Sequence, residues 1–178
     1  GQLNLNRAGS LGFFWPLATL HVDAGGILNM NGSLNVDGLI EFNGGTSNGG
    51  EFLLRAGAVL SGTGSVLSNV VSLSDTTMEI RATGPLTLGR ADQASGFRVD
   101  GSLLVNQHTV TLQDADTARV GSVWLNGGRL VFPPGGGSLY GGGILMGSGR
   151  VDGSTRNRGA IAADAAPGVS FSGVLESY

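Results

Sequence analysis

The chain of 178 residues contains no cysteine, no lysine and only two histidines. Without cysteine, a disulfide framework and a cysteine-ligated metal site are excluded. The ten basic residues are all arginine and the formal net charge is −3, so the clustered positive charge that binds a nucleic-acid backbone is missing. Charged residues make up 13% of the chain, about half of the usual share. We therefore expect no nucleic-acid partner and no cofactor.

Long apolar runs are also missing. None approaches the roughly 18 residues that a membrane-spanning helix needs, so we expect no transmembrane segment. No signal peptide is visible, and the chain begins at Gly1. We interpret the sequence as a mature product or a fragment of a longer chain.

Glycine is abundant, at 33 of 178 residues, and 40% of the chain is hydrophobic. The hydrophobic residues alternate with polar ones over short stretches, which indicates ordered β-strands rather than disorder. Turn signals such as Asn31-Gly32 and Asp37-Gly38 follow them closely. The clearest of these alternating stretches are residues 20–22, 28–30, 34–36, 40–42, 78–80, 86–88, 97–99, 110–112, 123–125 and 169–171.

A longer phrase, consisting of a strand end, a turn and the next strand, recurs along the chain. It occurs at residues 22–28, 54–60 and 80–86, and in a weaker form at residues 99–103 and 125–130. Its spacing of roughly 20 to 32 residues is typical of solenoids. Because one repeat cannot bury its own apolar face, stacking is required to close a core. We predict one β-solenoid domain over residues 1–178, with about six to nine coils.

Asn-Gly and Asp-Gly turns are also typical of hairpins, so an antiparallel β-sandwich or barrel is the alternative fold. The strands are short, often about six residues apart, and the phrase repeats in one direction, which favours parallel rungs. We expect longer loops at one corner, at residues 92–96, 114–118 and 133–137. No helix is predicted, and residues 154–166 should form turns and short strands.

The C-terminal third carries a recognisable pattern in residues 143–153, 157–161 and 166–173. It resembles the repeat of bacterial autotransporter passenger domains and related secreted β-solenoid proteins, which runs G-x-L-x-G-x-G-x-V-x-G, N-x-G-x-I and P-G-x-L-x-I-x-G-x-Y. The first Pro-Gly is missing at residues 162–163, and Tyr178 falls a few residues late for the final tyrosine. The resemblance implies a right-handed parallel β-helix, secreted or on a bacterial cell surface, that serves as an adhesin, surface layer or fibre.

Five residues are candidates for contact with a glycan. Asp114 and Asp116 lie on the same side of an extended segment, as paired carboxylates of sugar-cleaving enzymes do, although a solvated loop is the simpler interpretation. Arg55 and Arg81 occupy equivalent positions of the phrase and could form an outward ladder for an acidic sugar. Trp124 lies between two apolar strand residues and is expected to be exposed or to face a groove.

The aromatic run Phe13-Phe14-Trp15 is the densest in the chain. A solenoid has unpaired strand edges at its ends, which need a cap or a partner. We expect this run either to cover the first rung or to form an assembly interface with a neighbouring subunit.

A Walker motif and a calcium-binding nonapeptide are missing from the sequence. His21 should face solvent. We therefore predict a non-enzymatic extracellular structural or adhesive protein that associates end to end or binds a host or cell-surface glycan. The alternative is a β-helix that binds or degrades carbohydrate.

Overall fold

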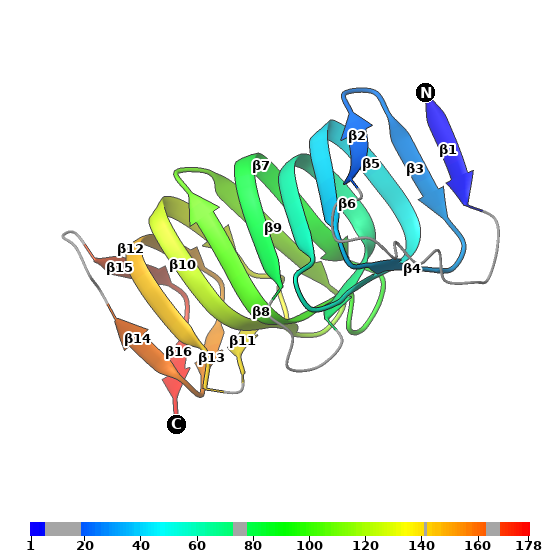
Figure 1. Ribbon diagram of the computed structural model, residues 1–178. Helices are drawn as coiled ribbons and strands as arrows, with labels where there is room; N and C mark the ends of the chain where they lie inside the picture. The colour runs from blue at the N-terminus through cyan, green and yellow to red at the C-terminus, as the bar shows by residue number, and fades with distance from the viewer. Residues whose placement is uncertain (6–18, 73–77, 141, 163–167) are drawn as a thin grey trace.

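The computed structural model describes residues 1–5, 19–72, 78–140, 142–162 and 168–178. These residues form sixteen strands and no helix, and the two termini lie at opposite ends of the molecule (Figure 1). The strands are β1 (Gln2–Leu5), β2 (Thr19–Asp23), β3 (Ile27–Met30), β4 (Ser33–Val36), β5 (Leu39–Leu54), β6 (Val59–Ser72), β7 (Glu79–Arg90), β8 (Phe97–Asn106), β9 (Thr109–Asp114), β10 (Ala118–Val131), β11 (Gly137–Leu139), β12 (Ile144–Asp152), β13 (Thr155–Asn157), β14 (Ala160–Ala162), β15 (Val169–Ser172) and β16 (Leu175–Ser177).

Each turn of the chain has three sides, as β5 shows. Its first part pairs with β2, its middle with β3 and its last part with β4. We name the three resulting sheets faces A, B and C. Face A contains residues 20–22, 40–42, 60–62, 80–82, 103–105, 123–125, 145–147 and 160–162. Face B begins with β1 and β3, and face C with β4.

All strand pairs in the described residues are parallel, which rules out the antiparallel alternative and confirms the parallel β-solenoid. One column of face A runs from Leu20 through Ile40, Leu60, Ile80, Leu103, Val123 and Leu145 to Ile161. Its members are 20, 20, 20, 23, 20, 22 and 16 residues apart along the chain. The chain makes about seven turns, within the predicted range.

The repeated phrase does not mark equivalent places in successive turns. Residues 22–28 form the corner between faces A and B, whereas residues 54–60 form the corner between faces C and A. Arg55 and Arg81 are therefore not in register, and the predicted equivalence is wrong: Arg81 pairs with Ser61 in the middle of face A. The reason is that every corner joins two short alternating strands by a glycine turn, so different corners have similar sequences.

The core consists of inward-facing columns of Leu, Val, Ile and Phe, as the alternation predicts. Phe42 of face A and Phe52 of face C meet edge to face inside it, with ring centroids 6.3 Å apart and an interplanar angle of 89°. Ser47 and Ser68 are fully buried and share a hydrogen bond of 2.9 Å, which compensates for the loss of water. The predicted longer segments at residues 92–96, 114–118 and 133–137 all lie at the corner between faces B and C.

Glycines allow the backbones of neighbouring rungs to approach closely at the corners. Gly62 has a φ of +124°, and a Cβ added there would overlap the carbonyl oxygen of Phe42 in the preceding rung. Gly57 also has a positive φ, of +80°, but a Cβ there would meet nothing within 4 Å. Alanine would strain the backbone at both positions, but only at Gly62 is there no room for its Cβ.

We expect Gly62→Ala to lower the free energy of unfolding by about 3 kcal/mol or more, because strain and overlap add. Gly57→Ala should cost only about 1 kcal/mol, from strain alone. Urea unfolding followed by circular dichroism measures both. Equal losses of unfolding free energy in the two variants would show that the close contact between rungs at Gly62 does not add to the cost of the substitution.

Candidate functional site

Trp124 lies in the outward column of face A, between Leu104 of the preceding rung and Met146 of the following one. It is 46% exposed, which makes it one of the largest apolar surfaces among the described residues. Strand alternation directs Val123 and Leu125 into the core, so the indole must point outward. The expectation that Trp124 is exposed or faces a groove is confirmed by its exposure.

A hollow of about 610 Å³ lies beside the indole. The outward residue two positions earlier on each strand of face A forms a second column, which contains Glu79, Ser102 and Ser122. Trp124 borders this column on one side, and Met78 and Asp100 border it at the corner between faces C and A. The hollow thus joins an aromatic plane to hydroxyl and carboxylate groups.

Each carboxylate of the hollow is paired with an arginine. Glu79 Oε2 accepts a hydrogen bond of 2.5 Å from Arg81, and this contact raises the pKa of Arg81 above its usual value. Asp100 Oδ1 accepts one of 2.9 Å from Nε of Arg119. The guanidinium of Arg119 also lies 3.1 Å from the ring centroid of Tyr140. The charges around the hollow are therefore balanced.

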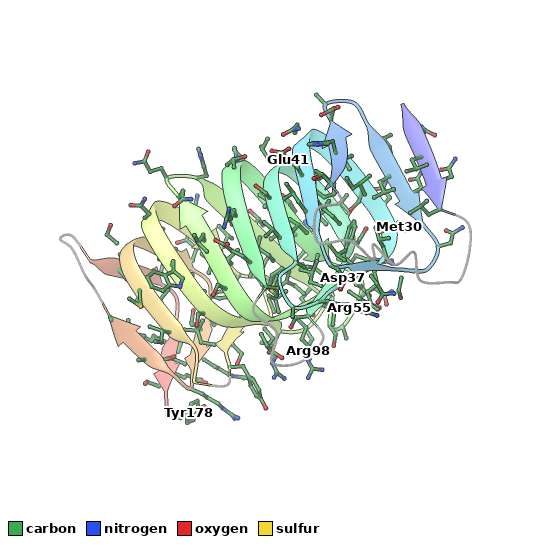
Figure 2. All side chains as sticks on the ribbon, in the orientation of Figure 1. Met30, Asp37, Glu41, Arg55, Arg98 and Tyr178 are labelled. Carbon is green, nitrogen blue, oxygen red and sulfur yellow. The ribbon has the colours of Figure 1, made fainter. Side chains whose placement is uncertain are left out.

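Arg55 lies away from this face. It donates to Asn35 Oδ1 at 3.2 Å and lies 3.9 Å from Asp37 at the corner between faces C and A. Figure 2 shows Arg55 next to Asp37 near the middle of the view, well below Glu41, which belongs to the same column of face A as Arg81. The two arginines do not form the expected ladder.

Asp114 and Asp116 lie at the corner between faces B and C. Asp114 is buried, and its two carboxylate oxygens accept hydrogen bonds from the backbone N–H groups of Phe97 (3.0 Å) and Asp116 (2.8 Å). Asp116 is exposed. One carboxylate of the pair is therefore buried and structural, and the other is exposed to solvent. Of the five predicted glycan contacts, only Arg81 and Trp124 lie in the same outward column of face A.

The sequence analysis did not identify Glu79, Asp100, Ser102 or Ser122 as site residues. Glu79, Ser102 and Ser122 each lie two residues before an outward residue of a face A strand. This shared position can be recognised only after the rungs have been aligned in register. His21 is exposed as predicted and lies 2.9 Å from Glu41. Phe13, Phe14 and Trp15 lie outside the described residues.

A second polar cluster surrounds Asp152 at the end of β12. Its carboxylate accepts hydrogen bonds from Arg129 of the preceding rung, Arg150 of its own strand and Ser172 of the following rung. These bonds, with Ser172 and then Arg150 contributing most, lower the pKa of Asp152 to about 2. The cluster joins three successive rungs and places one carboxylate between two arginines of neighbouring strands.

In the described ranges, no group of three or more His, Asp or Glu residues is arranged to hold a metal ion. The same residues contain no helix that could span a membrane.

The fold and its surface columns define the protein as a parallel β-solenoid. Comparison with known proteins found no matching family model, no matching curated protein and no matching solved structure. The resemblance of residues 143–173 to autotransporter passengers therefore stays a prediction.

We expect Asp114→Ala to lower the free energy of unfolding by about 2 kcal/mol, because the buried N–H group of Phe97 and the partly buried N–H group of Asp116 lose a charged acceptor. Asp116→Ala should change it by less than about 0.5 kcal/mol. Chemical denaturation compares the two. A glycan-contact role for Asp114 predicts the opposite pattern, in which carbohydrate binding is lost and stability is unchanged.

Asp152 should make the stability of the fold depend on pH. Its folded pKa of about 2 lies below the usual 3.8, so the ionised carboxylate stabilises the fold above about pH 4, and this contribution is lost as the pH falls toward 2. Asp152→Asn should therefore be less stable than the native chain at pH 6, and the difference should shrink between pH 4 and 2. Thermal melts across this range measure it, and a constant difference would contradict the assignment.

Proposed function

We propose that this chain is a non-enzymatic structural or adhesive protein of a bacterial exterior, and that it associates end to end with further copies of itself. The observation that carries the proposal is that inward-facing apolar side chains are exposed on the last rung that the structure describes. The face A column holds Ile40, Leu60, Ile80, Leu103, Val123 and Leu145 at no more than 1% exposure, yet Ile161, the next member, is 37% exposed.

Face C repeats this behaviour at the same end. Leu175 pairs with Thr155, which is 1% exposed, but Leu175 itself is 39% exposed and Val174 is 60% exposed. In Figure 1, strands β14, β15 and β16 lie together at the C-terminal end. In the described residues, none of these three strands has a second neighbour on its outer edge.

The first rung presents the matching surface. Leu3 of β1 is 49% exposed, although its register partner Leu28 is 1% exposed. Because all strands are parallel, the outer edge of β15 and the outer edge of β1, both on face B, have complementary hydrogen-bonding groups. Pairing of one end with the other end of a second copy is a head-to-tail contact, which builds filaments when it does not close into a ring.

A structural role outside the cell suits the way in which the fold is stabilised. Neighbouring rungs are joined by parallel backbone hydrogen bonds and apolar columns, and the chain has no cysteine that could be oxidised. The resemblance of residues 143–173 to secreted bacterial solenoids supports the same location.

The proposal predicts concentration-dependent association. The native chain should form oligomers or fibres in sedimentation velocity runs and electron micrographs, whereas Ile161→Asp combined with Leu175→Asp should stay monomeric, because charges are placed in the contact. Ile144→Asp is the matched control, since Ile144 is also 37% exposed but lies on the side of the solenoid. A native chain that stays monomeric at all concentrations would contradict the proposal.

Carbohydrate binding is the second candidate function, and the hollow beside Trp124 favours it. Carbohydrate degradation has less support, because the carboxylates expected to act together are separated by the burial of Asp114. Glu79 and Asp100 are each bound to an arginine. Binding without cleavage is compatible with an adhesive role.

A further inference from the structure

We propose that the hollow beside Trp124 on face A is a binding site for a neutral oligosaccharide. The proposal deepens the adhesive role proposed above by naming the site and the ligand class, and it does not depend on end-to-end association. It rests on the juxtaposition of an exposed indole, two serine hydroxyls and two carboxylates on one face of the solenoid.

The indole provides a platform for a sugar ring. Trp124 is 46% exposed, and its register neighbours Leu104 and Met146 are only partly buried, so the column offers a continuous apolar strip along the solenoid axis. The face of an aromatic ring carries a partial negative charge and attracts partially positive hydrogen atoms. The C–H groups on one side of a pyranose ring have this character, so the ring can stack on the indole.

The polar groups lie beside the platform, where the hydroxyl groups of a stacked sugar would project. Ser102 and Ser122 belong to successive rungs, so their side chains are about 4.8 Å apart along the axis. Hydroxyl groups both donate and accept hydrogen bonds, and the carboxylates of Glu79 and Asp100 add acceptors. A few polar groups beside an apolar surface are typical of sites that orient a small ligand.

The ion pairs of the hollow favour an uncharged ligand. Glu79 is held by Arg81 and Asp100 by Arg119, which in turn lies over Tyr140. A charged sugar would meet a like charge in either case, because an acidic sugar lies next to Glu79 and Asp100 and a cationic sugar lies next to Arg81. A neutral sugar can hydrogen-bond to the remaining lone pairs without breaking either pair.

The shape and direction of the hollow favour an oligosaccharide over a single sugar. It is a shallow hollow that is open to solvent rather than an enclosed pocket, so its walls do not block the two ends of a longer ligand. The columns of face A continue along the axis on both sides of Trp124, to Arg81 and to Met146. A chain of sugars can therefore follow the column across several rungs.

The test is isothermal titration calorimetry of the full chain with soluble hexasaccharides of known charge. Neutral gluco-, xylo- and manno-oligosaccharides are compared with an acidic oligogalacturonate and a cationic chitosan oligosaccharide. We expect saturable binding of at least one neutral probe and at least tenfold weaker binding of both charged probes, a difference of about 1.4 kcal/mol.

Two substitutions of Trp124 test whether the aromatic ring binds the sugar. Trp124→Ala should weaken binding of the neutral probe by about tenfold or more, whereas Trp124→Tyr should retain most of the affinity, because a smaller aromatic plane remains. Tyr178→Ala is the matched control, since Tyr178 is an aromatic that is 80% exposed at the C-terminal end, as Figure 2 shows. It should bind as the native chain does. Unchanged circular dichroism spectra and urea midpoints confirm that the variants fold.

Three results would overturn the proposal. The first is that no neutral probe binds at millimolar concentration, and the second is that Trp124→Ala binds as tightly as the native chain. The third is that Trp124→Ala dissociates oligomers of the chain while no sugar binds, which would make the hollow a contact between copies. Sedimentation of the same variant separates this result from failure of end-to-end association, which depends on Ile161 and Leu175 instead.

Discussion

The structure depends on the parallel backbone hydrogen bonds that join each rung to the next. A single rung of about 20 residues has three short strands and no second layer on which to pack its apolar side chains. Stacking in register solves this problem, because each inward side chain then lies on an equivalent side chain of the neighbouring rung. The column from Ile40 to Leu145 shows how completely the interior is buried as a result. At the last described rung, Ile161 is 37% exposed.

The same register also forms the outer surface. Residues about 20 positions apart in the chain become neighbours on a face, so a site can be assembled from single side chains of several rungs. Leu104, Trp124 and Met146 form an apolar strip in this way, and Ser102 and Ser122 form a hydroxyl strip beside it. Because the backbone is rigidly paired on both sides, such a surface is held in place before a ligand arrives, which lowers the entropic cost of binding.

Polar residues at the corners stabilise the places where regular pairing is interrupted. Asp114 accepts hydrogen bonds from two backbone N–H groups that a change of direction would leave without partners. Asp152 bridges three rungs through two arginines and a serine. Two acidic residues of this low-charge chain thus stabilise its corners, and the carboxylates beside Trp124 are balanced by arginines.

The sequence by itself determined the parallel β-solenoid, its number of turns, its apolar columns, the corner with longer loops and the outward position of Trp124. These follow from local alternation and turn chemistry, which act within a few residues. Only the tertiary structure decided which corner each phrase occupies, because corners of different length change the spacing of equivalent residues from 16 to 23 along one column. For that reason Arg55 and Arg81 are separated, Asp114 is directed inward, and Glu79 and Asp100 are brought to the indole of Trp124 by register between rungs.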